Sequence, residues 1–222
     1  RLFNALLEHA LHIARRNHQQ IAVVFLDLDD FKQINDTMGH DVGDELLKAV
    51  ALRLRESLRS SDTLARIGGD EFNILIEGIE ERTQIAPIVE KILDDFREPF
   101  VCNGHPIRTT TSIGIALYPE DGEDIVTLTK HADLAMYKSK NIGRNAYSYF
   151  SQDLFDAIEK KTLIIHELKA AIDTQSGFYL LYQPKVSVHE PEKMAIEALI
   201  RWKSEALGAM TPDRFIPIAE ES

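Results

Sequence analysis

Four carboxylates stand at two places in the sequence where metal chemistry is possible. Asp27 and Asp29 end the apolar run IAVVFLDLD, and Asp70 and Glu71 follow Gly68–Gly69 in RIGGDEFNILI. Acids at the end of a buried strand are costly unless they are paired or bound to a cation. Such oxygen ligands suit Mg²⁺ or Mn²⁺. If the fold brings the two places together, a two-metal site for transfer at a phosphoryl centre becomes possible.

A purely structural interpretation fits the same spacing. Strand alternation sends Asp27 and Asp29 to one side of the chain and Asp30 to the other. The first two could cap a helix that starts near Phe31, because acids favour helix N-termini. A Gly-Gly-Asp-Glu run is also compatible with a solvated turn. The spacing by itself leaves both interpretations open.

Two polar pairs accompany predicted helices. Asn35 and Asp44, in the polar turn NDTMGHDVGDELL, combine an amide with a carboxylate and so match the edge of a guanine base. Lys140 and Arg144, in YKSKNIGRN, lie four residues apart at a helix end and could hold phosphates. For each residue alone, a turn, cap or helix-dipole role is the commoner one.

The segment RSSD, just before the predicted hairpin, contains a third pair, Arg59 and Asp62. An ion pair between residues i and i+3 explains the spacing of these two residues simply. The more specific alternative is that the arginine binds a ligand. The eight histidines show no zinc-site spacing. Ser112 and Cys102 have no evident base nearby, so the sequence does not support nucleophilic catalysis.

Apolar periodicity predicts the elements that must position these residues. Helices are expected over residues 1–18, 41–58, 84–97 and 123–140. Strands are expected over residues 21–29, at TLARIG and EFNILIEG, twice around Asn103–Gly104 in VCNGHPIRTTTSIGIALYP, and at NAYSYF. Hairpins alternating with helical crossovers predict an α+β fold with a mainly antiparallel central sheet flanked by helices.

The pattern changes near Ser151. SQDLFDAIEKKTLIIHELKAAIDT predicts one long helix, YLLYQPKVSV and MAIEALIRW predict strands, and FIPIAEES begins another helix. We therefore expect one domain over residues 1–150, a connecting helix over 151–173 and part of a second domain over 174–222. The chain starts without Met inside a helical pattern and stops without an evident end, so both ends look like fragment boundaries.

Composition narrows the class of protein. The 222 residues are 44% hydrophobic and 27% charged, as in soluble globular proteins. A net charge of −11 argues against a nucleic-acid binder, which would carry a basic face. The sequence contains no membrane segment and no signal peptide, and its single cysteine fits a reducing cytoplasm. A parent protein anchored in a membrane through a preceding region is compatible with this expectation.

Four blocks, in order, resemble the diguanylate cyclase or GGDEF family over residues 1–150. They are FLDLDDFKQINDTMGHDVGDELL, RSSDTLARIGGDEF, TSIGIA and HADLAMYKSKNIGRN. The resemblance implies a palm-like fold related to nucleotidyl cyclases. It also implies Mg²⁺- or Mn²⁺-dependent condensation of two GTP into cyclic di-GMP and pyrophosphate, by attack of a 3′-hydroxyl on the α-phosphate. Since one domain holds one GTP, it implies at least a transient homodimer.

Carried onto this sequence, the resemblance assigns roles to the polar groups. Metal would be held by Asp27, the Leu28 carbonyl, Asp70 and Glu71, of which Asp70 and Glu71 are also the catalytic candidates, with roles not separated. GTP would be bound by Lys32, Asn35, Asp44, Gly68, Gly69, Lys140 and Arg144. Product feedback by cyclic di-GMP would use Arg59 and Asp62. Ser139 departs from the family pattern, where a small apolar residue is expected, and the entry motif preceding the first helix is missing.

From about Thr162 the chain resembles the start of an EAL cyclic di-GMP phosphodiesterase domain, through YQPK and EALIRW. Gln183, Glu197 and Arg201 are the matching candidates for substrate and metal binding. That family uses a TIM-like barrel, and two strands cannot close a barrel of eight. We therefore expect no phosphodiesterase activity from this segment. The alternative for the whole chain is a non-catalytic module that binds GTP or cyclic di-GMP and regulates a tandem phosphodiesterase.

Overall fold

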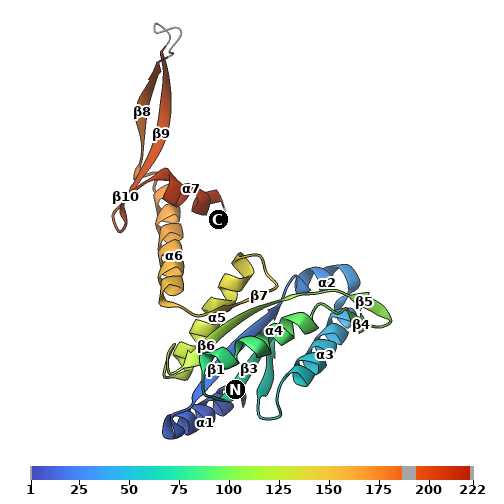
Figure 1. Ribbon diagram of the computed structural model, residues 1–222. Helices are drawn as coiled ribbons and strands as arrows, with labels where there is room; N and C mark the ends of the chain where they lie inside the picture. The colour runs from blue at the N-terminus through green and yellow to red at the C-terminus, as the bar shows by residue number, and fades with distance from the viewer. Residues whose placement is uncertain (1, 187–193, 221–222) are drawn as a thin grey trace. The chain divides into compact units, whose positions relative to one another are not determined.

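The computed structural model describes residues 2–186 and 194–220. Contacts divide the chain into two compact units, Arg1–Phe155 and Asp156–Ser222, each of which is described by itself. Figure 1 shows the sheet and helices of the first unit and the smaller group of elements that forms the second. Helix α6 (Gln152–Asp173) begins in the first unit and continues into the second.

The first unit is an α+β structure built on one sheet, as predicted. Its elements are α1 (Leu2–Asn17), β1 (Gln20–Leu28), α2 (Phe31–Met38), α3 (His40–Ser57), β2 (Thr63–Gly68), β3 (Glu71–Ile79), a 3₁₀ turn (Arg82–Gln84), α4 (Ala86–Asp95), β4 (Phe100–Cys102), β5 (His105–Ile107), β6 (Thr111–Tyr118), α5 (Ile125–Asn141) and β7 (Ala146–Tyr149). The sheet order is β2-β3-β1-β6-β7, with antiparallel neighbours except for the parallel β6–β7 pair.

Strand β1 lies at the centre of the sheet and is buried on both faces, which explains its continuous apolar run. Ala22, Val24 and Leu26 pack into a core shared with α3 and α4. Ile21 and Val23 point the other way, into a core shared with α1 and α5. The period-two alternation therefore places Asp27, the acid near the end of β1, on the α5 side of the sheet.

Helix α5 approaches β6 very closely at Gly114. A Cβ at this position would overlap the Ala132 carbonyl oxygen and the Met136 backbone nitrogen, so a larger residue would push the helix away. Near its end, α5 is also tied to β6 because the buried Ser139 hydroxyl donates to the Ile113 carbonyl at 2.7 Å. The departure at Ser139 therefore forms a polar link that holds the C-terminal end of α5 on the sheet.

Two predictions about the first unit were wrong. Residues 35–38 were expected in a turn, but they form the second half of α2, and the chain turns only at Gly39, where φ is +91°. VCNGHPIRTTTSIGIALYP was expected to hold two strands, but it contains three. The tight turn at Asn103 and Gly104, both with positive φ, closes the separate hairpin β4–β5, and β6 then starts afresh in the main sheet.

The second unit contains the predicted strands β8 (Phe178–Val186) and β9 (Met194–Ser204), the predicted helix α7 (Pro212–Glu220), and a short strand β10 (Gly208–Met210) that was not predicted. The strands form an antiparallel sheet in the order β10-β9-β8, and the described residues form no closed barrel. Trp202 is fully buried between Phe178 and Phe215. The last two residues of YLLYQPKVSV, the last two of FIPIAEES and residue 1 lie outside the described residues.

Candidate functional site

The end of β1 and the tip of the β2–β3 hairpin lie side by side. Asp27 is directly opposite Glu71 in the antiparallel register, and the Leu28 N–H donates to the Asp70 carbonyl at 3.4 Å. Side chains that face each other across a strand pair share one face of the sheet. The structure therefore brings together the two acidic segments that lie more than 40 residues apart in the sequence.

Asp27 is the buried member of this acidic group. Its side chain receives a salt bridge from Lys140, with 2.8 Å between Nζ and Oδ1. Burial raises the pKa of Asp27 above its usual range, and the charges of Asp70 and Glu71 raise it further, whereas the hydrogen bond and charge of Lys140 lower it. A cation placed among these acids would relieve the same unfavourable charge.

The donor chemistry fits a hard divalent cation, although the side chains do not converge on one point. Within residues 2–186 and 194–220, no group of three or more His, Cys, Asp and Glu side chains is arranged to hold a metal ion. One Asp27 oxygen faces Lys140 instead. The remaining oxygens of Asp27, Asp70 and Glu71 are nevertheless of the type that Mg²⁺ and Mn²⁺ prefer.

Asp29 follows two residues later but is used differently. Its buried carboxylate accepts hydrogen bonds from the Thr110 and Ser112 hydroxyls, at 2.6 and 2.7 Å, and from the Asn145 N–H at 3.1 Å. The N-cap of α2 is Asp30, which has left-handed backbone and no side-chain hydrogen bond to the helix. The alternative in which Asp27 and Asp29 cap this helix is therefore not supported.

The glycine pair allows a tight turn at the hairpin tip and leaves the space beside the two glycines open. Gly69 has φ of +53°, and its carbonyl accepts a hydrogen bond from Arg66 Nε at 2.9 Å. Gly68 has no such backbone requirement, and a Cβ built there would meet no atom within 4 Å. Among the residues that the structure describes, no packing therefore requires Gly68 to lack a side chain, and the space around its Cα is open.

Asn35 and Asp44 lie on consecutive helices, α2 and α3. The Asn35 side-chain oxygen is buried and has no hydrogen-bond partner among the described residues. It lies against Gly43, where an added Cβ would overlap it, while Asp44 is exposed on the next position of α3. A buried acceptor without a partner is unfavourable, so this oxygen is suited to receive a donor from a ligand.

Gly43→Ala is expected to weaken binding of a guanine nucleotide about tenfold or more, because the new methyl group displaces the Asn35 oxygen. Calorimetry with 3′-deoxy-GTP, which lacks the 3′-hydroxyl and is not turned over, measures the affinity directly. Asp41→Ala, on the exposed first turn of α3, is the matched control and should bind as the unmodified chain does. Equal affinities for Gly43→Ala and the control would contradict a role for Asn35.

The cations predicted to hold phosphates come from two elements. Lys140 contacts Asp27, Arg144 lies with its Nε 3.8 Å from Asp30 Oδ1, and Lys32 is exposed on the first turn of α2. Lys140 and Arg144 are thus brought to acids at the C-terminal end of β1 and just beyond it. Among the described residues, Lys32 forms no ion pair and is free to reach a ligand.

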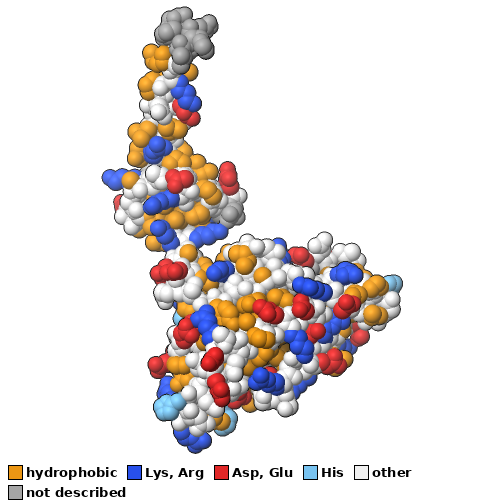
Figure 2. All heavy atoms as spheres, in the orientation of Figure 1, with side chains coloured by type: hydrophobic (Ala, Val, Ile, Leu, Met, Phe, Trp, Pro, Cys, Tyr) orange, Lys and Arg blue, Asp and Glu red, His pale blue; other side chains and the backbone are white. Residues whose placement is uncertain are grey.

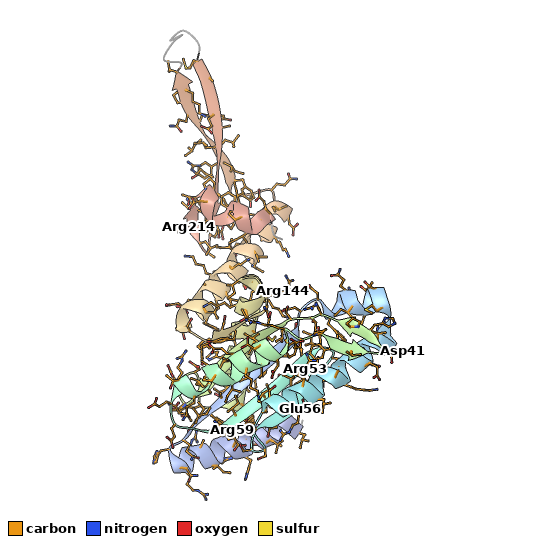
Figure 3. The ribbon with its side chains drawn as sticks, turned by 45° about the vertical axis from the view of Figure 1, so that its right-hand side comes forward. Asp41, Arg53, Glu56, Arg59, Arg144 and Arg214 are labelled. Carbon is orange, nitrogen blue, oxygen red and sulfur yellow. The ribbon has the colours of Figure 1, made fainter. Side chains whose placement is uncertain are left out.

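Arg59 and Asp62 lie elsewhere, and Figure 3 shows Arg59 well separated from Arg144. They form no ion pair in the described part of the chain, so that explanation is wrong. Instead, Asp62 is 2% exposed and accepts the Arg59 backbone N–H at 2.9 Å. Arg55 donates to the Asp62 carbonyl at 2.7 Å, and the second carboxylate oxygen of Asp62 is buried without a hydrogen-bond partner among residues 2–186 and 194–220.

The candidates in the second unit lie on the β8–β9 pair. Gln183 and Glu197 are directly opposite each other, and Arg201 lies four residues further along β9 on the same face. Glu197 forms a salt bridge with Lys185, with 2.8 Å between Nζ and Oε2. Arg201 donates to the adjacent Ile200 carbonyl at 2.8 Å.

Asn73 is a polar residue near the site that the sequence prediction missed. It is 5% exposed in the middle of β3, and with Glu71 and Asp133 it lines a hollow of about 490 Å³ between the sheet and α5. The available signal was the single amide in the otherwise apolar strand core FNILI. The sequence predicted Asp29 only as a metal ligand or a helix cap, and it predicted no role for Asn145, which donates to Asp29.

Surface and helix properties agree with the composition. The face of the first unit in Figure 2 mixes acidic and basic side chains and shows no continuous basic area. Within the described part of the chain, no helix combines the length and the apolar character needed to cross a bilayer.

Comparison with known proteins matches each of the two units to a protein family. Residues 1–146 match the model of the diguanylate cyclase, GGDEF domain family, and residues 165–222 match the EAL domain. MucR of Pseudomonas aeruginosa, named a bifunctional diguanylate cyclase/cyclic di-GMP phosphodiesterase, is 41% identical over 216 residues, which cover 97% of this chain and 31% of MucR. NbdA of the same organism, named a cyclic di-GMP phosphodiesterase, is 38% identical over 218 residues, with coverages of 98% and 28%.

The chain thus spans less than a third of the length of these two relatives. Among solved structures, the GGDEF domain of TpbB (YfiN) from Pseudomonas aeruginosa is similar with a TM-score of 0.67 and 38% identity. The match covers 68% of this chain and 94% of that one. The family model, the sequence identity and the fold agree over the first unit, which carries Asp27, Asp70 and Glu71. The chain therefore belongs to the diguanylate cyclase GGDEF domain family and continues into part of an EAL domain.

Proposed function

We propose that residues 1–150 form a diguanylate cyclase that condenses two GTP into cyclic di-GMP and pyrophosphate. The observation that carries this proposal is the buried Asp27 carboxylate, held beside Glu71 and Asp70 and contacted by Lys140. A buried acid in a group of acids, paired with the partly exposed ammonium group of Lys140, is suited to exchange its partner for a metal–phosphate pair. Residues 151–173 connect this domain to the EAL segment at 174–222.

Each binding role then falls to a particular group. Mg²⁺ or Mn²⁺ would be held by Asp27, the Leu28 carbonyl, Asp70 and Glu71, and when bound it neutralises triphosphate charge and favours displacement at the α-phosphorus. Lys140 would leave Asp27 for a phosphate oxygen, joined there by Arg144 and Lys32. The unpartnered Asn35 oxygen and the exposed Asp44 would accept hydrogen bonds from guanine. Gly68 and Gly69 leave room for the nucleotide.

The reaction requires two copies of the domain, because each holds one GTP and the 3′-hydroxyl of one must reach the α-phosphate of the other. We therefore propose a homodimer that forms at least transiently. Orientation of two bound nucleotides is where most of the acceleration would arise, since correct placement lowers the entropic barrier. Arg59 and Asp62 would provide product feedback by binding cyclic di-GMP. In this structure the Asp62 carboxylate accepts a hydrogen bond from the Arg59 backbone N–H.

A second candidate is a non-catalytic module that binds GTP and regulates an EAL partner. The relationship to NbdA, which is named a phosphodiesterase, favours it. Against it stands a set of intact residues, some of which a degenerate domain usually loses: Asp27, Asn35, Asp44, Asp70, Glu71 and Lys140. The EAL segment itself is not expected to hydrolyse cyclic di-GMP, because its described strands form an open three-stranded sheet.

The test is to incubate the purified chain with GTP and Mg²⁺ over a range of protein concentrations and to quantify cyclic di-GMP by chromatography. Synthesis that rises faster than linearly with protein concentration supports a cyclase working as a dimer. GTP binding by calorimetry without product, even at concentrations that favour dimers, would overturn the cyclase and establish the regulatory module. Removal of the cation with EDTA should stop synthesis.

A further inference from the structure

The buried carboxylate of Asp29 joins three segments of the first unit. It is 5% exposed, follows the end of β1, and accepts the hydroxyls of Thr110 and Ser112 at the start of β6. Its third hydrogen bond comes from the backbone N–H of Asn145, at 3.1 Å. With both oxygens engaged, Asp29 has little capacity left to bind a metal ion, although it lies on the same side of the chain as Asp27.

The segment reached by this third hydrogen bond has an unusual backbone. Gly143, Arg144 and Asn145 have φ values of +126°, +62° and +46°. Three consecutive residues with positive φ are disfavoured for a chain that includes an arginine, and such a conformation persists only where surrounding contacts impose it. Two contacts do so here, because the Arg144 N–H donates to the Ser139 carbonyl at 3.1 Å and the Asn145 N–H donates to Asp29.

This conformation determines where Arg144 lies. Its side chain is directed to the segment after β1, with Nε 3.8 Å from Asp30 Oδ1, and remains 53% exposed. Asp30 also has left-handed backbone, with φ of +58°. If the hydrogen bond to Asp29 were lost, one of the two contacts that impose the turn would be gone, and we expect the turn to relax toward ordinary dihedral angles and Arg144 to move away from Asp30.

We infer that Asp29 is a positioning residue: its carboxylate holds the turn at residues 143–145 in left-handed conformation and so presents Arg144 to the nucleotide's phosphates. This inference rests on the proposed function, in which Arg144 binds the triphosphate. It assigns two carboxylates of one strand end to different tasks. Asp27 faces the ligand, whereas Asp29 orders the backbone that carries a cation to it.

The test compares affinities for two probes on the full chain with Mg²⁺ present. 3′-Deoxy-GTP carries the triphosphate without being turned over, and its binding is measured by calorimetry. Guanosine has no phosphates, and its binding is measured by NMR titration. Asp29→Ala is expected to lower affinity for 3′-deoxy-GTP about tenfold, as expected for one charge-assisted contact, and to leave affinity for guanosine unchanged. If the alanine variant does not fold, Asp29→Asn is measured against the same criterion.

A double-mutant cycle separates positioning from general stabilisation. Arg144→Ala should lose as much triphosphate affinity as Asp29→Ala, and the double variant should lose no more than Arg144→Ala alone. Ser112→Ala is the matched control, because it removes one hydrogen bond to the same carboxylate and keeps the one from Asn145. It should lower the melting temperature and leave the affinity for 3′-deoxy-GTP unchanged.

Two results would overturn the inference. One is an equal loss of guanosine and 3′-deoxy-GTP affinity in the Asp29 variants, which indicates general damage to the site. The other is additive losses in the double variant. If the unmodified chain binds 3′-deoxy-GTP and the Asp29 variants bind it equally well, the inference alone fails. If the unmodified chain binds neither probe, the proposed function fails as well.

Discussion

Asp27→Asn is expected to reduce the rate of cyclic di-GMP synthesis by about 100- to 1000-fold while the chain stays folded. Asparagine keeps the shape of the side chain but removes the buried charge that faces Lys140 and the proposed metal. Burial of a charged carboxylate is unfavourable, and the same burial raises the pKa of Asp27, so we expect removal of this charge not to reduce thermal stability greatly. The large effect on rate therefore arises from lost electrostatic stabilisation of the reacting phosphate.

The measurement is the initial rate of product formation at saturating GTP and Mg²⁺, with melting followed by circular dichroism on the same samples. Asp36→Asn, an exposed acid on α2 that lies outside the proposed site, removes the same charge and should keep the original rate. An Asp27→Asn rate within about threefold of the original would show that this carboxylate does not hold the metal. Asp70→Ala, at the hairpin tip, is expected to abolish turnover and to leave the fold intact.

Lys140→Met is expected to raise the KM for GTP about 10- to 100-fold. The substitution keeps the aliphatic stem and removes the ammonium group, and a hydrogen bond to a charged group contributes roughly 1.5–3 kcal/mol. The substitution also changes the pKa of Asp27. Without Lys140, the pKa of Asp27 rises further, because the charge and hydrogen bond of this lysine are what lower it.

Lys138→Met is the control for this prediction, because it removes the same charge two residues earlier on α5, on another side of the helix. Its KM should match that of the original chain. Steady-state kinetics over a wide range of GTP concentration distinguishes a rise in KM from a fall in kcat. A pure fall in kcat for Lys140→Met would show that this lysine acts only in the transition state and does not hold the ground-state triphosphate.

The sequence predicted the parts of the fold that local pattern controls. The apolar run of β1 and the glycine pair between β2 and β3 identified the central strand and its hairpin, and both are present. The errors in the helix and strand boundaries arose where the backbone conformation of one or two residues determines where an element ends. The chain stays helical until Gly39, and the turn at Asn103–Gly104 closes a small hairpin that leaves β6 to start separately. The short helix α2 is largely polar, so it does not show the apolar periodicity that identifies a longer helix.

What the sequence determined by itself was the chemistry available: acids at a strand end, acids at a glycine hairpin, and cations at a helix end. Only the tertiary structure decided which acid does what. Asp27 and Asp29 have the same residue type, the same burial and the same side of the strand. They differ in their partners, and all of these partners are distant in sequence: the donors to Asp29 lie 81, 83 and 116 residues further along the chain, and Asp27 contacts Lys140. No local pattern encodes such distant contacts. Folding around β1 places those donors on Asp29 and leaves Asp27 to face Lys140, next to Asp70 and Glu71.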